Sequence, residues 1–383
     1  MVILNKILHF WFIAIIFLTT TGGGDMRSMQ PQAPVKGAYW PSWKESEFSP
    51  SNINTTFYTH IYYAFLVPDN ITNKFEISDS TAELLSNFTT TLRHKTPPVK
   101  TLISFGGGGS DEVTKLLALI ASDSKLSETF IISSFEVARK FGFDGLDPDW
   151  ESPSSPKEMK DLARLLKQWR KAIKKEAKAT NQPPLLLTAA VYFSVDFFLD
   201  DVYRSFPTGS IRRNLDWINV MAYDYHGAWD PSMTGALAAL YDKSTNVSTS
   251  HGLRSWIRAG VPPGKICMGL PLYGRTWTLK DPNSHGIGSA AILAGPGDGL
   301  LTYSEVVEFN NKYNATVLYD IDSVSTYSFV GSSWIGYDDP ISTTIKIGFA
   351  QALGLRGYFF WALSFEKDFE ISTYASRAWV MTE

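Results

Sequence analysis

Eight short apolar runs, separated by longer amphipathic stretches, limit the possible folds of this sequence more than any other feature. Each run has the length and composition of a buried strand, and the stretches between them have the apolar spacing of helices. This alternation favours a (β/α)8 barrel, with an open doubly wound sheet as the second possibility. The predicted strands are Val35–Trp40, His60–Phe65, Lys100–Phe105, Gly145–Trp150, Leu185–Tyr192, Trp217–Tyr223, Ile266–Leu272 and Gly357–Trp361.

The helical pattern is clearest between Lys157 and Glu176, where the apolar residues form one stripe and lysines and arginines occupy the other face. The chain has 383 residues, of which 44% are hydrophobic, and this is enough for one large core. Further helices are predicted at Thr81–Leu92, Asp111–Ser122, Leu126–Lys140, Asp196–Ser205, Ser250–Ala259 and Ser342–Leu353.

The interval between the seventh predicted strand and the helix at Ser342 is too long for a simple connector. It contains strand-like runs at Ala315–Tyr319 and Thr326–Val330 and a helix-like run at Tyr303–Lys312. We therefore expect a small α+β insertion at residues 275–340. The barrel would then comprise residues 32–274 and 341–383.

The first residues have the order of charge, apolar run and small residues that is typical of a secretory signal. Lys6 is followed by the apolar run Ile7–Leu18 and then by small residues up to Gly24. We predict a signal peptide at residues 1–24, with a signal anchor as the alternative. The mature protein would be extracellular, or vacuolar if sorted, and not held in a membrane.

Asparagine sequons and the cysteine content agree with a secretory route. Glycosylation is possible at five Asn-x-Ser/Thr sites. Cys267 is the only cysteine, so no disulfide within the chain is possible, and we expect this residue to be a small buried hydrophobe. The net charge of −3 argues against a nucleic-acid partner. The candidate glycosylation sites are Asn54, Asn70, Asn87, Asn246 and Asn314.

Three acidic residues alternate along the fourth predicted strand, at Asp147, Asp149 and Glu151. Side chains on a strand alternate between faces, so these carboxyl groups should point the same way. Like charges this close cannot all ionise freely, and at least one should hold a proton near neutral pH. Glu151 would lie nearest the mouth of the barrel, which makes it the natural proton donor.

A metal site or a structural acid cluster is the alternative interpretation of these acids. The chain has six histidines, and none has ligand spacing with another histidine or with the acids. We therefore expect neither a metal nor a cofactor, and we interpret the segment as catalytic.

The segment Asp144-x-x-Asp147-x-Asp149-x-Glu151 resembles the signature of family 18 glycoside hydrolases, the chitinases. The resemblance covers nearly all of the chain after residue 32 and is greatest to plant class V chitinases. It implies a barrel enzyme that cleaves β-1,4-linked N-acetylglucosamine chains as a monomer. Matching positions outside the acid segment are Gly37 and Tyr39, Phe65, Ser104-Phe105-Gly106-Gly107, Met221-Ala222-Tyr223-Asp224, Tyr273-Gly274-Arg275 and Trp361.

The resemblance also implies a retaining, substrate-assisted mechanism, in which the acetamido oxygen of the sugar attacks its own anomeric carbon. Glu151 would be the acid and base, Asp149 would orient the acetamido group, and Asp147 would share a proton with Asp149. Tyr223 would bind the acetamido group, and Trp361 would form the floor under the sugar ring.

Other substrate contacts follow from the same resemblance. Polar groups would hold sugar hydroxyls, and aromatic residues would form the walls of the site or platforms for more distant sugars. The hydroxyl-binding pair is Asp224 and Arg275, the wall residues are Tyr39 and Phe65, the distant platforms are Trp43 and Trp229, and Met221 and Tyr273 complete the expected contacts.

The sequence departs from the family pattern beside the acids. Pro148 replaces an aliphatic residue, and Ser152 replaces an aromatic one. Gly108 and Gly109 stand where many animal and bacterial relatives have a tryptophan. Two alternatives to a chitinase therefore stay open: a hydrolase of modified, lipid-bearing chitooligosaccharides, and a chitin-binding lectin or inhibitor on the same fold.

Overall fold

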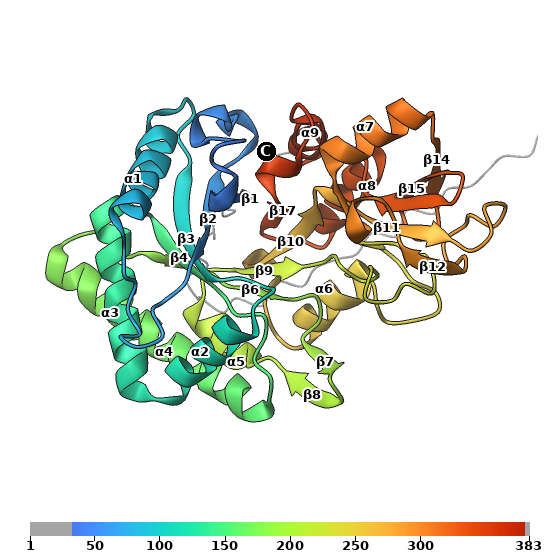
Figure 1. The fold of residues 1–383 in the computed structure, drawn as a ribbon. Coiled ribbons are helices and arrows are strands. Elements are labelled where there is room, and N and C mark those ends of the chain that lie inside the picture. Colours follow the sequence, from blue (N-terminus) through green and yellow to red (C-terminus); the bar gives the residue numbers. More distant parts are fainter. Residues whose placement is uncertain (1–32, 380–383) are drawn as a thin grey trace, which may run out of the picture. The chain divides into compact units, whose positions relative to one another are not determined.

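The computed structural model describes residues 33–379, and a closed parallel barrel forms its centre (Figure 1). The predicted signal peptide at residues 1–24 lies outside the described residues. The strands follow the order β3-β2-β1-β17-β10-β9-β6-β4-β5, and pairing of β3 with β4 closes the barrel. Their bounds are β1 Val35–Pro41, β2 His60–Leu66, β3 Lys100–Gly106, β4 Gly145–Asp149, β5 Leu186–Leu187, β6 Ala190–Tyr192, β9 Ile218–Met221, β10 Ile266–Pro271 and β17 Gly357–Trp361. Since β5 and β6 fill one position, the predicted (β/α)8 barrel is confirmed.

Strands from the two ends of the described chain complete the barrel. β1 and β17 pair in parallel, with Val35 opposite Gly357. A side chain at Gly357 would collide with the backbone carbonyl of Val35, because a Cβ there would lie 1.8 Å from its oxygen. Glycine at this position therefore allows the first and last strands to approach closely.

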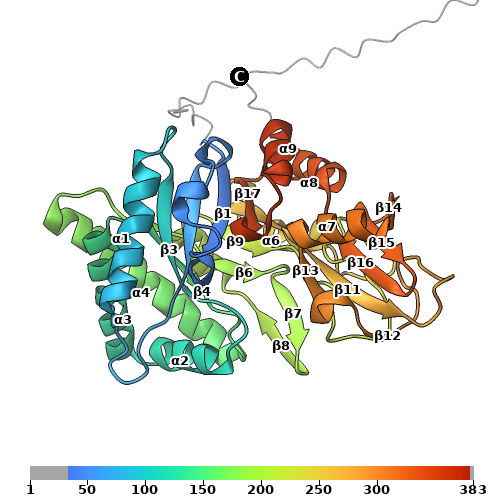
Figure 2. The same cartoon turned by 45° about the horizontal axis from the view of Figure 1, so that its top comes forward.

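Helices cover the outside of the barrel (Figures 1 and 2). The predicted apolar stripe of α4 is buried, and the Trp169 indole on this stripe donates a hydrogen bond of 3.2 Å to Ser134 on α3. Two helices, α2 and α3, fill the single connection between β3 and β4. The covering helices are α1 Asp79–His94, α2 Asp111–Ser122, α3 Ser124–Phe141, α4 Pro156–Thr180, α5 Thr208–Asn214, α6 Thr249–Arg258, α8 Pro340–Ala352 and α9 Glu370–Ala378.

A second, antiparallel sheet lies between β10 and α8, beside the barrel (Figure 2). It has its own aromatic core, in which the rings of Trp277 and Trp334 meet edge to face. The buried ammonium of Lys346 on α8 lies 2.6 Å from the carboxylate of Asp338, which follows the last strand of this sheet. The elements of the insertion are β11 Tyr273–Leu279, β12 Ala291–Ala294, β13 Leu300–Thr302, α7 Tyr303–Tyr313, β14 Thr316–Asp320, β15 Ser325–Val330 and β16 Ser333–Tyr337.

One predicted element is wrong. The segment Asp196–Ser205, expected to be a helix, is a hairpin of β7 (Asp196–Leu199) and β8 (Val202–Ser205). Asp200 and Asp201 form its turn, and both have positive φ, at 50° and 59°. This is the type I′ geometry that joins two antiparallel strands, and aspartate tolerates it well.

Burial decides one further sequence prediction. Cys267 is fully buried on β10, as expected for a small hydrophobe. Among residues 33–379, no helix has the length and apolar character needed to cross a membrane.

Candidate functional site

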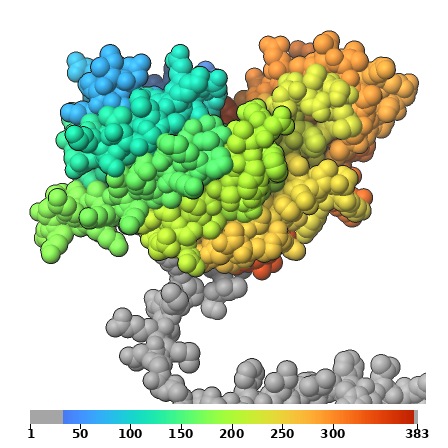
Figure 3. Space-filling model, turned by 90° about the horizontal axis from the view of Figure 1, so that it is seen from below, coloured from blue at the N-terminus to red at the C-terminus, as the bar shows by residue number. Residues whose placement is uncertain are grey.

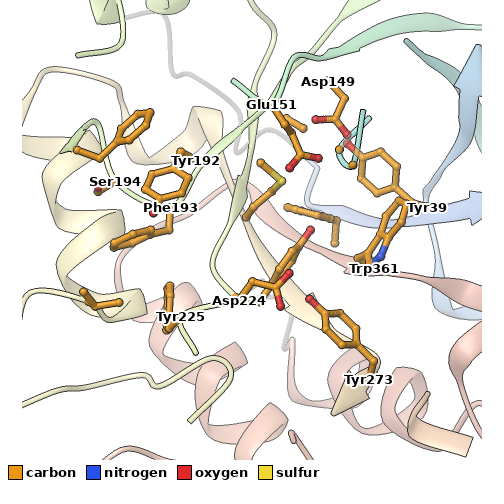
Figure 4. A pocket seen from close by; sticks show the side chains of 18 of the residues that line it. Tyr39, Asp149, Glu151, Tyr192, Phe193, Ser194, Asp224, Tyr225, Tyr273 and Trp361 are labelled. Atoms are coloured by element: carbon orange, nitrogen blue, oxygen red, sulfur yellow. The ribbon is translucent and has the colours of Figure 1, made fainter. Parts of the chain in front are cut away.

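A cavity of about 980 Å³ opens at the carboxyl ends of the barrel strands. Active sites of barrels of this type lie at this end. Figure 3 shows the molecular surface hollowed between the N-terminal segments and the insertion, and Figure 4 shows the side chains that line the cavity. The acids Asp149 and Glu151, with Tyr39, Tyr273 and Trp361 near them, occupy one part of it, and Tyr192, Phe193, Ser194 and Tyr225 occupy the other.

The three acids follow β4 toward this cavity, as the alternation predicts. Asp147 is fully buried behind the cavity, Asp149 is 4% exposed, and Glu151 opens onto the cavity. Pro148 points to the other face, where it lies among apolar residues of the helix layer such as Leu162 and Leu166. The proline therefore does not contact the acids, but it stands between two of them in the chain.

Asp147 is held by four side chains from four different strands or strand ends. Its carboxylate accepts hydrogen bonds from Tyr39 (2.7 Å), Ser104 (2.9 Å), Thr188 and, at 3.5 Å, Asn219. Burial raises the pKa of Asp147 to about 6, and the bonds from Thr188, Tyr39 and Ser104 oppose this rise. The donors thus favour the ionised form of a carboxyl that has no contact with solvent.

Asp149 and Glu151 are joined by a hydrogen bond, and each influences the pKa of the other. Burial, followed by the charges of Glu151 and Asp147, raises the pKa of Asp149 well above its ordinary value. Protein atoms around the Glu151 carboxyl, followed by the charge of Asp224, raise its pKa to about 7. Asp149 therefore holds a proton at neutral pH and donates a hydrogen bond to Glu151. The other oxygen of this carboxyl group, Oδ1, has no partner among the described residues.

The backbone of Gly108 lies directly against the Glu151 carboxyl. Its N–H donates to the carboxylate and opposes the rise in the pKa of Glu151. A Cβ on Gly108 would lie 3.0 Å from both carboxylate oxygens, which is closer than most such contacts. A side chain at this position would therefore displace the Glu151 carboxyl group, and glycine lets the loop after β3 lie against it.

Replacement of Gly108 by alanine should lower kcat by about 10-fold, because a small displacement of a catalytic group from its productive geometry is costly. Gly109 also lines the cavity, but nothing lies near its missing Cβ. However, Gly109 has a φ of +87°, so alanine there would strain the loop without touching Glu151. Steady-state rates of both variants, together with their melting temperatures, separate displacement of the acid from loop strain. Equal losses of rate would contradict our expectation.

Aromatic side chains form a continuous strip on one side of the acids. The ring of Trp361, at the end of β17, stacks on Phe65 at 5.6 Å, and Phe65 stacks on Trp43 at 6.2 Å. Trp43 is 56% exposed, while Tyr39 is buried beside Trp361 at 5.7 Å. Flat apolar surfaces of this kind suit the apolar faces of sugar rings.

Met221 ends β9, Tyr223 follows it by two residues, and both line the cavity. Burial, followed by the charges of Glu151 and Asp149, raises the pKa of Tyr223 well above its ordinary value. Tyr223 therefore stays a hydroxyl donor throughout the neutral range. The ring of Tyr273, from the start of β11, meets Tyr223 edge to face at 6.3 Å.

Arg275 and Asp224 form an ion pair of 2.8 Å at the rim. The Arg275 guanidinium lies over the ring of Trp229 at 4.9 Å and over that of Tyr273 at 5.4 Å. Neither Arg275 nor Trp229 lines the cavity, although Asp224 does. The structure therefore places Trp229 as a support for Arg275, with 59% of its side chain exposed at the rim.

Several site residues were not predicted from the sequence. The hairpin β7–β8 and the end of β6 provide a second aromatic wall, and the loop before α6 closes it. The residues at the end of β6 could have been expected from the sequence, because the carboxyl ends of the strands of a barrel meet in one place. The unpredicted cavity residues are Ala190, Tyr192, Phe193, Ser194, Asp196, Phe197, Phe198, Tyr225, Asn246, Val247, His251 and Phe359.

No group of three or more histidine, cysteine, aspartate or glutamate side chains is placed to hold a metal ion within residues 33–379. The acids and hydroxyl groups of the site can donate protons, remove protons and stabilise a positive charge.

Comparison with known proteins gives a family for residues 36–366, which match the family described as glycosyl hydrolases family 18. The chain is 51% identical over 347 residues to the class V chitinase CHIT5b of Medicago truncatula, covering 90% of each protein. It is 52% identical over 351 residues to Nod factor hydrolase protein 1 of the same organism, again covering 90% of each.

The fold agrees with these relatives. A family 18 chitinase mutant from Cycas revoluta, solved in complex with (GlcNAc)4, superposes with a TM-score of 0.87 and 40% sequence identity. The match covers 90% of this chain and 100% of that one.

Proposed function

The chain belongs to family 18 of the glycosyl hydrolases, and on that premise we propose that it hydrolyses β-1,4 linkages between N-acetylglucosamine residues of chitin or chitooligosaccharides. The observation that carries this proposal is the hydrogen-bonded pair of Asp149 and Glu151 in a cavity with an aromatic floor. It offers a protonated carboxyl group beside a stacking platform for a sugar ring.

The reaction is substrate-assisted and retains the configuration of the anomeric carbon, as an exception to the scheme with two reacting carboxylates. The sugar to be cleaved lies on Trp361. Its acetamido oxygen attacks the anomeric carbon, the glycosidic C–O bond breaks, and Glu151 gives its proton to the leaving oxygen. Asp149 and Tyr223 hold the acetamido group and stabilise the positive charge of the oxazolinium ion.

The second half of the reaction reverses the proton flow. The Glu151 carboxylate takes a proton from water, and the water oxygen bonds to the anomeric carbon and opens the oxazolinium ring. In both halves Asp147 stays ionised behind Asp149 and offsets the positive charge of the oxazolinium ion.

The product anomer tests this proposal directly. Short N-acetylglucosamine oligomers are incubated with the protein, and the products are followed by NMR and mass spectrometry from the first turnovers. We expect initial β-anomers and shorter oligomers. Release of α-anomers would contradict retention, and binding without cleavage would favour the lectin alternative.

A second substrate class is chitooligosaccharides that carry an acyl chain. The aromatic strip of Trp361, Phe65 and Trp43 ends on an exposed tryptophan, which can contact an acyl chain as well as a sugar. Similarity to a protein named Nod factor hydrolase protein 1 also supports this class. Ratios of kcat/KM for acylated and unmodified oligomers of equal length decide between them.

We further propose that the chain follows the secretory route and is glycosylated. Four sequon asparagines are exposed in turns, loops or element ends, at Asn54, Asn70, Asn246 and Asn314. Asn87 differs, because its sequon residue Thr89 is buried on α1 and donates to the Phe141 carbonyl at 2.7 Å.

A glycan on Asn246 should restrict access to the cavity, because this exposed asparagine lies in its wall beside Val247. In protein secreted by a eukaryotic host, Asn246→Gln should increase the rate on polymeric chitin and leave the rate on short oligomers unchanged. Asn70→Gln removes an exposed sequon that does not line the cavity and is the matched control. An unglycosylated Asn246 peptide in the parent would contradict the prediction.

A further inference from the structure

A row of buried polar side chains crosses the barrel interior below Asp147. Trp217, Tyr62 and Asn219 are each at most 2% exposed, and none lines the cavity. The Trp217 indole donates to the Tyr62 hydroxyl at 3.0 Å, and this hydroxyl donates to the Asn219 carbonyl at 3.4 Å. The Asn219 amide then donates to the Tyr39 hydroxyl at 3.0 Å, and Tyr39 donates to Asp147 at 2.7 Å.

All of these hydrogen bonds point toward Asp147. The indole N–H has no acceptor function, so Tyr62 must use its proton elsewhere, and Asn219 Oδ1 accepts it. Asn219 is then oriented with its two N–H groups toward Tyr39 and Asp147. Because Tyr39 accepts from Asn219, its own proton goes to Asp147. A donor at the far end of the row thus sets the direction of every bond.

We propose that Trp217, Tyr62 and Asn219 are positioning residues that keep Asp147 ionised, so that the proton shared by the acids stays on Asp149. A protonated Asp147 would need an acceptor for its own proton. Tyr39 and the Asn219 amide, which end the row, both donate to Asp147 and so offer no acceptor. The position of this proton matters for catalysis, because Asp149 can donate a hydrogen bond to Glu151 only while it holds the proton. The proposal deepens the proposed function and rests on it for its kinetic test.

The other groups that face Asp147 agree with this assignment. From its own strand these are Asp149 and then Glu151, both of which carry raised pKa values. Tyr223 faces it from the end of β9 and Cys267 from β10, and burial raises the pKa of each well above neutral. Burial likewise keeps Tyr39 and Tyr62 protonated, so both remain donors at every pH of interest. No cation is in direct contact with Asp147 among the hydrogen bonds and ion pairs of residues 33–379.

Tyr62→Phe is the sharpest test, because it removes one hydroxyl from the row and leaves Asp147, Tyr39 and the cavity in place. Loss of the directed bonds should raise the pKa of Asp147, and the acidic limb of the kcat profile should move up by roughly half a pH unit. KM should stay the same. Trp217→Phe should have a similar effect, and the double variant should add little to either single change, because the row acts as one unit.

Tyr358→Phe is the matched control, since Tyr358 is equally buried on β17 but takes no part in the row. A loss of packing alone would affect both tyrosine variants alike and would leave both pH profiles unchanged. An unchanged acidic limb in Tyr62→Phe, or an equal shift in Tyr358→Phe, would overturn the proposal.

A second readout does not depend on hydrolysis. Asp147 has a pKa of about 6 in the folded protein and an ordinary value of 3.8 when exposed. The folded state therefore binds more protons in this interval, and the free energy of unfolding falls as pH rises. In Tyr62→Phe this fall should continue to higher pH than in the parent or in Tyr358→Phe. If the protein cleaves nothing, chemical denaturation between about pH 5 and pH 7 still decides the proposal.

Discussion

Replacement of Glu151 by glutamine is expected to lower kcat for chitooligosaccharides by about 10³-fold, because an amide cannot donate the proton that the leaving oxygen needs. The amide is similar in size and keeps its acceptor oxygen for the Gly108 N–H. Binding should therefore survive, with a dissociation constant within a few-fold of the parent's KM. Rates come from mass spectrometry of products and binding from calorimetry.

The matched control is Glu83→Gln, which changes an exposed acid on the outer helix α1 and should leave the rate unchanged. The pH profile of the parent also tests whether Glu151 is the proton donor. Because the acid must be protonated and its pKa is about 7, the rate of the parent should fall as pH rises above neutral. Retention of a tenth of the rate by Glu151→Gln would assign the proton donor to another group.

Asp149→Asn is expected to lower kcat by about 10²- to 10³-fold, a loss typical of removing one group that stabilises charge in a transition state. The amide's N–H groups cannot pass a proton to Glu151, and it therefore cannot gain the negative charge that Asp149 gains on passing its proton and that offsets the oxazolinium ion. Steady-state kinetics on an oligomer of fixed length measure the loss, and KM should change little.

Asp144→Asn is the control for Asp149, because Asp144 immediately precedes the same strand. Its carboxylate accepts a bond of 2.9 Å from the Thr101 backbone N–H, far along the strand from the cavity. This variant should be less stable but should keep its kcat. Equal losses of kcat in both variants would mean that distortion of β4, and not the chemistry of Asp149, lowers the rate.

The fold was predictable from the sequence where burial alone decides local structure. Apolar runs such as Ile266–Leu272 have no alternative to a buried strand, and the stripe on α4 has only one face to bury. The hairpin at Asp196–Ser205 was not predictable from spacing, since Phe198, Leu199 and Val202 also fit a helical period. The Asp200-Asp201 turn signal outweighs that period, because it reverses the chain.

The placement of the three acids toward the cavity was predictable because alternation along one strand is a local property. The row from Trp217 to Asp147 was not, since its members come from four strands, β1, β2, β4 and β9, that are distant in sequence. The role of Trp229 stays a prediction. Its position in the chain suggested a sugar platform, but a cation, Arg275, lies over its ring.

The pairing of β1 with β17 has a consequence for biosynthesis. The ribosome completes β4, with all three acids, long before it reaches β17, and contacts between segments so distant in sequence form slowly. Until β17 emerges, β1 and β10 each have one unpaired edge, and the floor provided by Trp361 does not exist. The stacking floor for a sugar ring is therefore complete only after translation has passed the last strand.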